Sequence, residues 1–180
     1  HLRAEGGRTV RDVCGTDEAV INLVSLTNNQ YETVIIEQPP EFFRRLYPNA
    51  LWRMDPNEKA VYLTFDDGPI PVVTPWVLDL LDKQDIKATF FMVGDNIRKN
   101  PAEFRMVVER GHRIGNHTFN HIRGFEYTAR KYLENAEQAK IFMEMGGTIN
   151  CNVEKVIYPL LFRPPHGHMF AGQYMKLKRQ

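Results

Sequence analysis

Residues 61–69 have the sequence Val-Tyr-Leu-Thr-Phe-Asp-Asp-Gly-Pro, in which an apolar run leads into two acidic residues and a turn. The β-branched and aromatic side chains of residues 61–65 predict a short strand, and the Gly-Pro pair predicts a turn soon after it. Asp66 and Asp67 therefore stand at the end of the expected strand. Adjacent carboxylates repel each other unless a cation or an arginine compensates their charge, so we expect a positive group beside them.

Outward from this stretch, segments typical of strands alternate with segments typical of helices. Thr74-Pro75 and Asn100-Pro101 each combine a helix-capping residue with a proline suited to the first helical position. Gly111 and the pair Gly146-Gly147 predict helix ends. The expected strands are residues 61–65, 88–93, 113–115 and 156–162, and the expected helices are residues 76–83, 101–110 and 128–145. This alternation predicts a parallel sheet with helices outside it, and chemistry where strands end and loops begin.

A second motif, Asn-His-Thr-Phe-Asn-His, occupies residues 116–121 after the third expected strand. His117 and His121 are four positions apart, a spacing that places two side chains on one face of a helical turn. Both imidazoles could then reach one metal ion, as in the helical motif of zinc proteases. A single histidine is more often structural or simply exposed, so the prediction depends on the pair.

A third motif, Phe-Arg-Pro-Pro-His-Gly-His, occupies residues 162–168 after the last expected strand. The two prolines stiffen the backbone that follows Arg163. A proline-rich surface turn would explain the pattern without any function. The functional interpretation presents Arg163 toward the strand-end face, where it can pair with a carboxylate.

Taken together, the motifs supply two histidines and one carboxylate that could share a metal ion: Asp67, His117 and His121. Three protein ligands leave a coordination position open for water or substrate, which is the pattern of a catalytic rather than a structural zinc site. A set of this kind can also hold iron, cobalt or nickel. We expect a divalent metal, with Zn²⁺ preferred and Co²⁺ or Ni²⁺ as alternatives.

Residues 64–69, 117–121 and 163–167 resemble, in this order, three motifs of the NodB-like polysaccharide deacetylase family. The resemblance extends from about residue 58 to residue 178, and the combination is highly specific. It implies an α/β fold, a distorted and incomplete (β/α) barrel that lacks its last strands. It also implies hydrolysis of N-acetyl groups on amino sugars, with a glycan that contains N-acetylated amino sugars as the partner.

The resemblance also assigns roles to the matched residues. The implied metal ligands are Asp67, His117 and His121. Asp66 would be the general base that acts on the attacking water, and Arg163 would keep it ionised and oriented. His166 stands where the family often has tyrosine, and its backbone N–H would stabilise the oxyanion of the tetrahedral intermediate.

The chain departs from the family pattern after Gly167, because the later family motifs have no counterpart before Gln180. One of those motifs supplies a histidine as general acid, a contribution of about 10²–10⁴ in rate. We expect an incomplete record of a longer enzyme rather than a truncated protein, because missing strands would expose a sheet edge. As a hypothesis, His166 or His168 replaces the acid; a pH–rate profile that is unchanged when both are substituted would contradict it.

Residues 1–57 are expected to form an N-terminal extension that packs on the barrel domain of residues 58–180. Residues 21–26 could form a short strand, and residues 41–46 are an amphipathic segment. Four aromatic side chains of the extension are expected to pack on the main body: Phe42, Phe43, Tyr47 and Trp52.

The formal net charge of +1 gives no electrostatic reason to expect binding to nucleic acid or to an anionic membrane. No apolar run approaches the roughly 20 residues of a membrane span. The two cysteines, Cys14 and Cys151, do not make a disulfide framework.

Because the first residue is His1 rather than Met, we expect a processed or omitted segment before it. With no signal peptide visible, the compartment stays open between cytoplasm and secretion.

Three functions remain after these observations: a glycan N-deacetylase, a metal-assisted hydrolase of a non-sugar C–N bond, and an inactive glycan-binding module. The pair of Asp66 and Arg163 argues against the third, because binding alone needs no general base, whereas the missing acid histidine argues for it. The first function predicts aromatic sugar subsites, although such side chains more often pack in cores. The candidates are Trp52, Trp76, Tyr127 and Phe170. The oligomeric state and the identity of the glycan stay open.

Overall fold

The computed structural model describes residues 39–55, 57–148 and 161–178. Its sheet contains four parallel strands in sequence order, which are β1 (Thr64–Gly68), β2 (Thr89–Met92), β3 (Arg113–Asn116) and β4 (Leu161–Phe162). A doubly wound sheet reverses its strand order at a switch point, whereas sequential parallel order is that of a (β/α) barrel wall. The expected α/β class is confirmed.

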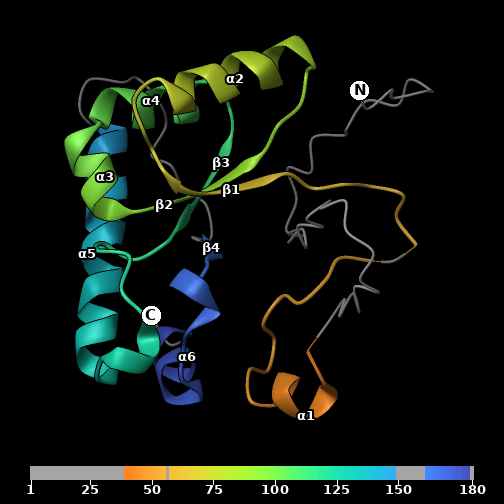
Figure 1. Ribbon diagram of the computed structural model, residues 1–180, viewed down its shortest axis with the longest axis vertical. Helices are drawn as coiled ribbons and strands as arrows, with labels where there is room; N and C mark the ends of the chain where they lie inside the picture. The colour runs from red at the N-terminus through yellow and green to blue at the C-terminus, as the bar shows by residue number, and fades with distance from the viewer. Residues whose placement is uncertain (1–38, 56, 149–160, 179–180) are drawn as a thin grey trace, which may run out of the picture.

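Helices connect the strands and cover the sheet (Figure 1). The connecting helices are α2 (Val73–Lys83), α3 (Gly94–Lys99), α4 (Pro101–Glu109) and α5 (Ala129–Thr148). Helix α1 (Glu41–Arg44) precedes the first strand and α6 (Ala171–Leu177) follows the last, and two short 3-10 helices are η1 (Gly124–Glu126) and η2 (Pro165–Gly167). The long helix α5 packs against α3 and α4, and also against α6. Helix α2 packs against α4 at the end of the molecule opposite α6 (Figure 1).

The main core lies between the strands and helices α2 to α5. Its buried side chains include Leu78 of α2, Met92 of β2, Phe104 of α4 and Ile114 of β3. Burial of each such side chain contributes about 1.5–3 kcal/mol relative to its exposure. This core positions the strand ends, where the acidic pair and the two later motifs are located.

A second, smaller core joins the segment after α1 to α6. The hydroxyl of Tyr47 donates a 2.6 Å hydrogen bond to the backbone oxygen of Met169, and its ring packs against Trp52 and Tyr174. Phe43 also contacts the Tyr47 ring, but the expectation for Phe42 is wrong, since its side chain is 72% exposed. No residue of the one-turn helix α1 is buried. The division of the chain at residue 57 stays a prediction.

The first strand differs most from its expected bounds, whereas β2 and β3 agree with theirs to within one residue at each end. Strand β1 begins at Thr64 rather than residue 61, because its ladder with β2 starts where Thr64 pairs with Thr89. The strand therefore includes both aspartates instead of ending before them. For the last strand, Leu161 and Phe162 are observed, and residues 156–160 lie outside the described residues, as do residues 21–26, Cys14 and Cys151.

Neither expected helix cap forms a capping hydrogen bond, because both polar side chains bond to the loop after β1 instead. Thr74 lies inside α2, where its hydroxyl accepts a 2.8 Å hydrogen bond from the Ile70 N–H. Asn100 precedes α4 as expected, but its side-chain amide donates to the Pro69 carbonyl rather than capping the helix. Helix α3 was not expected at all.

Gly146 does not end α5, which continues to Thr148. A Cβ on Gly146 would lie 2.8 Å from the Phe104 ring, which is shorter than the contacts that real Cβ atoms make with non-bonded atoms. The glycine therefore allows two helices to pack closely rather than terminating one. Within residues 39–55, 57–148 and 161–178, no helix combines the length and apolar composition needed to cross a membrane.

Candidate active site and metal centre

A β-bulge in β1 places both acidic side chains at one site. Asp66 pairs with Phe91 of β2 and Gly68 pairs with the next residue, Met92, so that Asp67 is an extra residue between them. Asp67 has a φ of 68°, a left-handed conformation uncommon outside glycine. Neighbouring side chains of a regular strand point to opposite faces, and a bulge re-aims one of them. Both carboxylates can therefore serve the same chemistry.

The two histidines of the second motif lie in an irregular loop after β3 and not on a helix. The expected helical turn is wrong, because Thr118 and His121 have φ values of 63° and 54°, which an α-helix of L-residues does not contain. The loop nevertheless brings the rings of His117 and His121 to a centroid distance of 5.0 Å. The spacing therefore selects two histidines that lie together, although the conformation that joins them is not the expected one.

Hydrogen bonds from three elements hold this loop in its unusual conformation. The side-chain oxygen of Asn116 accepts from the Thr118 N–H at 2.8 Å. The side-chain oxygen of Asn135 on α5 accepts from two further backbone N–H groups, those of Phe119 and Asn120. The first N–H of α3, from Gly94, donates to the Thr118 carbonyl at 3.0 Å. These partners satisfy backbone groups that a loop would otherwise leave unpaired.

Asp67, His117 and His121 each offer one ligand atom, and these atoms lie within 4.8 Å of one another. Asp67 Oδ1 is 3.0 Å from His121 Nε2 and 3.5 Å from His117 Nε2. Two imidazole nitrogens and one carboxylate oxygen that converge in this way suit a divalent metal ion. The three ligands expected from sequence are thus brought together from β1 and the loop after β3.

The environment of His117 favours the form that can bind a metal. Its Nδ1 lies 2.7 Å from the Arg163 carbonyl oxygen, so Nδ1 carries the proton and the lone pair of Nε2 faces Asp67. Burial lowers the pKa of His117, although the Arg163 carbonyl and the two carboxylates act in the opposite direction. A neutral imidazole is the ligand form, because a protonated ring has no free lone pair.

Arg163 extends from the end of β4 to the acidic pair. Its Nη1 is 2.6 Å from Asp66 Oδ1 and 3.0 Å from the Thr64 hydroxyl oxygen. Its Cζ lies 3.9 Å from the centroid of the Phe91 ring, a cation–π geometry that restricts the guanidinium. The compensating positive group expected beside the aspartates is therefore Arg163.

A sequence model of the family described as polysaccharide deacetylase matches residues 53–177. The chain belongs to the polysaccharide deacetylase family. It is 42% identical over 118 residues to a peptidoglycan-N-acetylglucosamine deacetylase of Bacillus cereus, a match that covers 66% of this chain and 51% of that protein. It is 44% identical over 75 residues to a chitooligosaccharide deacetylase of Sinorhizobium fredii, covering 42% of this chain and 35% of that protein. The chain thus spans about half, or less, of these relatives.

The fold agrees with solved structures of the family. Peptidoglycan deacetylase PdaC from Bacillus subtilis superposes with a TM-score of 0.60 at 30% sequence identity, covering 69% of this chain and 58% of that chain. The family resemblance and the barrel-type fold expected from the motifs are confirmed. The individual roles of Asp66, Arg163 and His166 remain predictions.

His166 of this deacetylase-family chain lies beside the proposed ligands. Its ring centroid is 4.8 Å from that of His121. The residue belongs to η2 and has a left-handed φ of 56°. In the first turn of a helix the N–H group has no preceding intrahelical acceptor, so the geometry leaves the His166 N–H available to an incoming group.

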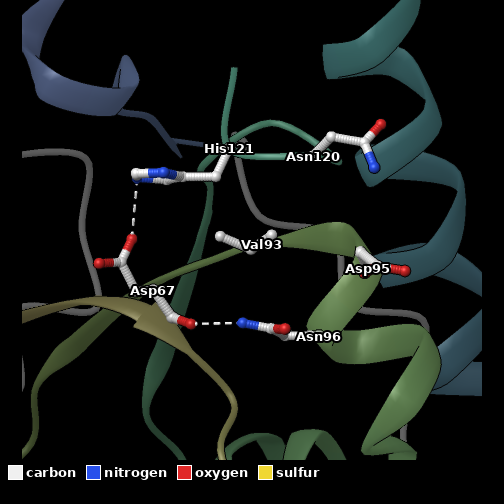
Figure 2. Close-up of a pocket in the computed structure, with 6 residues that line it drawn as sticks. All are labelled: Asp67, Val93, Asp95, Asn96, Asn120 and His121. Atoms are coloured by element: carbon white, nitrogen blue, oxygen red, sulfur yellow. Dashed lines mark hydrogen bonds and ion pairs between the residues drawn. The ribbon is translucent and has the colours of Figure 1, made fainter. Parts of the chain in front are cut away.

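A pocket of about 330 Å³ adjoins the proposed metal ligands on the side of α3. Figure 2 shows its lining, which consists of Asp67, Val93, Asp95, Asn96, Asn120 and His121. The Asn96 amide donates a 2.7 Å hydrogen bond to the backbone oxygen of Asp67 and so supports the bulge. Sequence reasoning missed Asn96, because it lies on a helix of six residues, too short for a clear periodic signal.

Proposed function

We propose that the protein is a metal-dependent hydrolase that removes N-acetyl groups from amino-sugar glycans of the peptidoglycan or chitin type. The carrying observation is the Arg163–Asp66 ion pair beside the convergent side chains of Asp67, His117 and His121. A site that only bound a metal or a sugar would not need a second, arginine-paired carboxylate. The names of the relatives support peptidoglycan and chitooligosaccharides as the substrate class.

Zn²⁺ is the metal that we propose for the site, with Co²⁺ or Ni²⁺ as alternatives. Its holders would be Asp67, His117 and His121. Such an ion, when bound, supplies a Lewis acid that polarises the amide carbonyl and lowers the pKa of water. The buried His117 ring and its bond to the Arg163 carbonyl support the role of this residue as an oriented ligand.

In the proposed reaction, Asp66 takes a proton from the water that attacks the acetamide carbon. The Arg163 guanidinium binds Asp66 Oδ1 and so orients the other carboxylate oxygen toward that water. The His166 N–H donates to the oxygen that gains negative charge, a contribution of about 2.7–4 kcal/mol for one such donor in other enzymes. The leaving amine must then gain a proton before the product is released.

The test is acetate release from N-acetylglucosamine oligomers and from peptidoglycan fragments, after chelation and after addition of Zn²⁺ or Co²⁺. Asp66→Asn should lower the rate by about 10²–10⁴ without abolishing metal binding. Asp79→Asn is the matched control. Asp79 is an exposed carboxylate on α2 and pairs with Arg110, the residue that follows α4. Its rate should equal that of the unmodified protein.

Absence of acetate release, with one metal bound per chain, would overturn the proposal. Release of ammonia or ring opening from cyclic amides under the same conditions would favour hydrolysis of a non-sugar C–N bond. Binding of the oligomers without any turnover would favour the glycan-binding alternative.

A further inference from the structure

A row of aromatic rings leads outward from the proposed metal ligands. The His121 ring is followed by His166 at a centroid distance of 4.8 Å and then by His168 at 5.8 Å. His168 stacks on Phe125 at 4.8 Å with an interplanar angle of 15°. Phe125 contacts Phe170, again at 4.8 Å. The row therefore connects the site to two phenylalanines from different segments, η1 and the start of α6.

The outer end of the row is exposed. Phe125 is 49% and Phe170 is 51% accessible, and we call these two rings the aromatic platform. Two large apolar rings that contact each other while half of each faces solvent contribute little to a core, and contiguous exposed apolar surface often marks a binding site. Their flanking charges neutralise each other, since Arg123 Nη1 lies 3.5 Å from Glu126 Oε1.

A buried glutamine holds the platform in place. Gln173 is 1% exposed, and its side-chain oxygen accepts from the Phe170 N–H at 2.8 Å. Its amide nitrogen donates to the carbonyls of Gly124 and Tyr127 on either side of Phe125. The Gly124 N–H in turn donates to the His168 carbonyl at 2.9 Å. These bonds tie η1 to α6, so the two rings are positioned before any ligand arrives.

We propose that the aromatic platform binds an uncharged pyranose ring of the glycan chain, some sugars away from the one that loses its acetyl group. This inference rests on the proposed function. The face of a phenylalanine ring carries negative quadrupole potential, which attracts the polarised C–H groups on the face of a sugar. His166 and His168 separate the platform from His121, so only a longer oligomer reaches it.

The structure gives different environments to two of the aromatic residues that the sequence suggested as sugar subsites. Phe170 belongs to the platform, whereas Trp52 packs in the second core beside Tyr47. Phe125 was not singled out, because nothing in the linear sequence places it beside Phe170. Their contact depends on the hydrogen bonds of Gln173.

The experiment compares acetate release from the disaccharide and the pentasaccharide of N-acetylglucosamine. Phe125→Leu keeps the apolar bulk but removes the ring face, and Phe125→Tyr keeps the face. We expect Phe125→Leu to raise KM for the pentasaccharide about three- to tenfold, with kcat and the disaccharide kinetics unchanged. The KM of Phe125→Tyr for the pentasaccharide should equal that of the unmodified protein. Leu80→Ala is the control, since Leu80 is 47% exposed on α2, at the other end of the molecule (Figure 1).

Calorimetric binding of the pentasaccharide to Asp66→Asn protein, with and without Phe125→Leu, tests the platform independently of turnover. Weaker binding in Phe125→Leu, together with unchanged binding in Phe125→Tyr, supports the platform. If this result is found but no acetate is released, only the proposed function fails. An unchanged KM and an unchanged affinity in Phe125→Leu overturn the platform. Equal losses on the disaccharide and the pentasaccharide also overturn it, because they indicate a disturbed reaction site.

Discussion

His117 Nδ1 and the backbone oxygen of Arg163 are 2.7 Å apart, so the residue directly after β4 serves both halves of the candidate site. The Arg163 backbone orients a proposed metal ligand, while its side chain holds the proposed general base, Asp66. A further backbone bond, from the Arg163 N–H to the Asn116 carbonyl, joins β4 to β3 at the same point. Substitution of the side chain alone should therefore separate catalysis from metal binding.

Arg163→Lys should lower kcat by roughly 10–100-fold while leaving metal stoichiometry unchanged. A lysine lacks the planar guanidinium that here bridges Thr64 and Asp66 and lies over Phe91. Steady-state acetate release and metal analysis of the purified protein measure the two effects. Arg98→Lys is the matched control on α3, where the arginine pairs with Asp95. Equal kcat values for the two variants would argue against positioning by Arg163.

Asp67→Ala, His117→Ala and His121→Ala should each weaken Zn²⁺ binding by more than about 100-fold, because even outer partners of metal ligands contribute 10–100-fold. Asp66→Asn should bind Zn²⁺ as the unmodified protein does. Titration calorimetry with a competing chelator measures these affinities. Unchanged affinity in any of the three alanine variants would remove that residue from the ligand set.

His112 should make folding stability depend on pH. It is 2% exposed, and its burial lowers the pKa from 6.5 to about 4. His112 therefore becomes protonated near pH 6.5 in the unfolded chain but only near pH 4 in the folded protein. The stabilisation is fully present above pH 6.5 and is lost as the pH falls toward 4, by about 3 kcal/mol in total.

Urea unfolding of the unmodified protein and of His112→Asn at several pH values tests this dependence. Asparagine can still accept the Ala88 N–H that His112 Nδ1 accepts at 3.2 Å, but it does not titrate in this range. The unfolding free energy of the variant should therefore fall less between pH 6.5 and 4. Parallel pH curves for the two proteins would show that His112 is not the cause.

Gly115→Ala should destabilise the fold and lower activity together. A Cβ on Gly115 would lie 2.5 Å from the Phe91 ring, and Phe91 supports the Arg163 guanidinium. Overpacking of this kind costs about 1–3 kcal/mol. Gly172→Ala is the control, because a Cβ there meets no atom within 4 Å. Thermal unfolding and kcat measure the outcome, and a Gly115→Ala protein with unchanged Tm and kcat would contradict the packing argument.

Local sequence patterns were sufficient for the alternation of strands and helices and for the residues that meet at the strand ends. The apolar run of β2 and the proline at the start of α4 act over a few neighbouring residues, so they can be recognised without knowledge of the fold. The proposed ligand set of Asp67, His117 and His121 could be suggested from sequence because metal chemistry restricts the residue types, and the structure brings these three side chains together.

Only the tertiary structure determined how those residues are aimed. The bulge at Asp67 depends on its register against β2, and the left-handed loop at Thr118 depends on Asn116, Asn135 and the start of α3. These partners lie far along the chain or have no periodic signal. Side-chain direction depends on register and on long-range hydrogen bonds, whereas propensity and turn chemistry are local. The sequence by itself therefore determined which residues meet at the strand ends, and the fold alone determined their geometry.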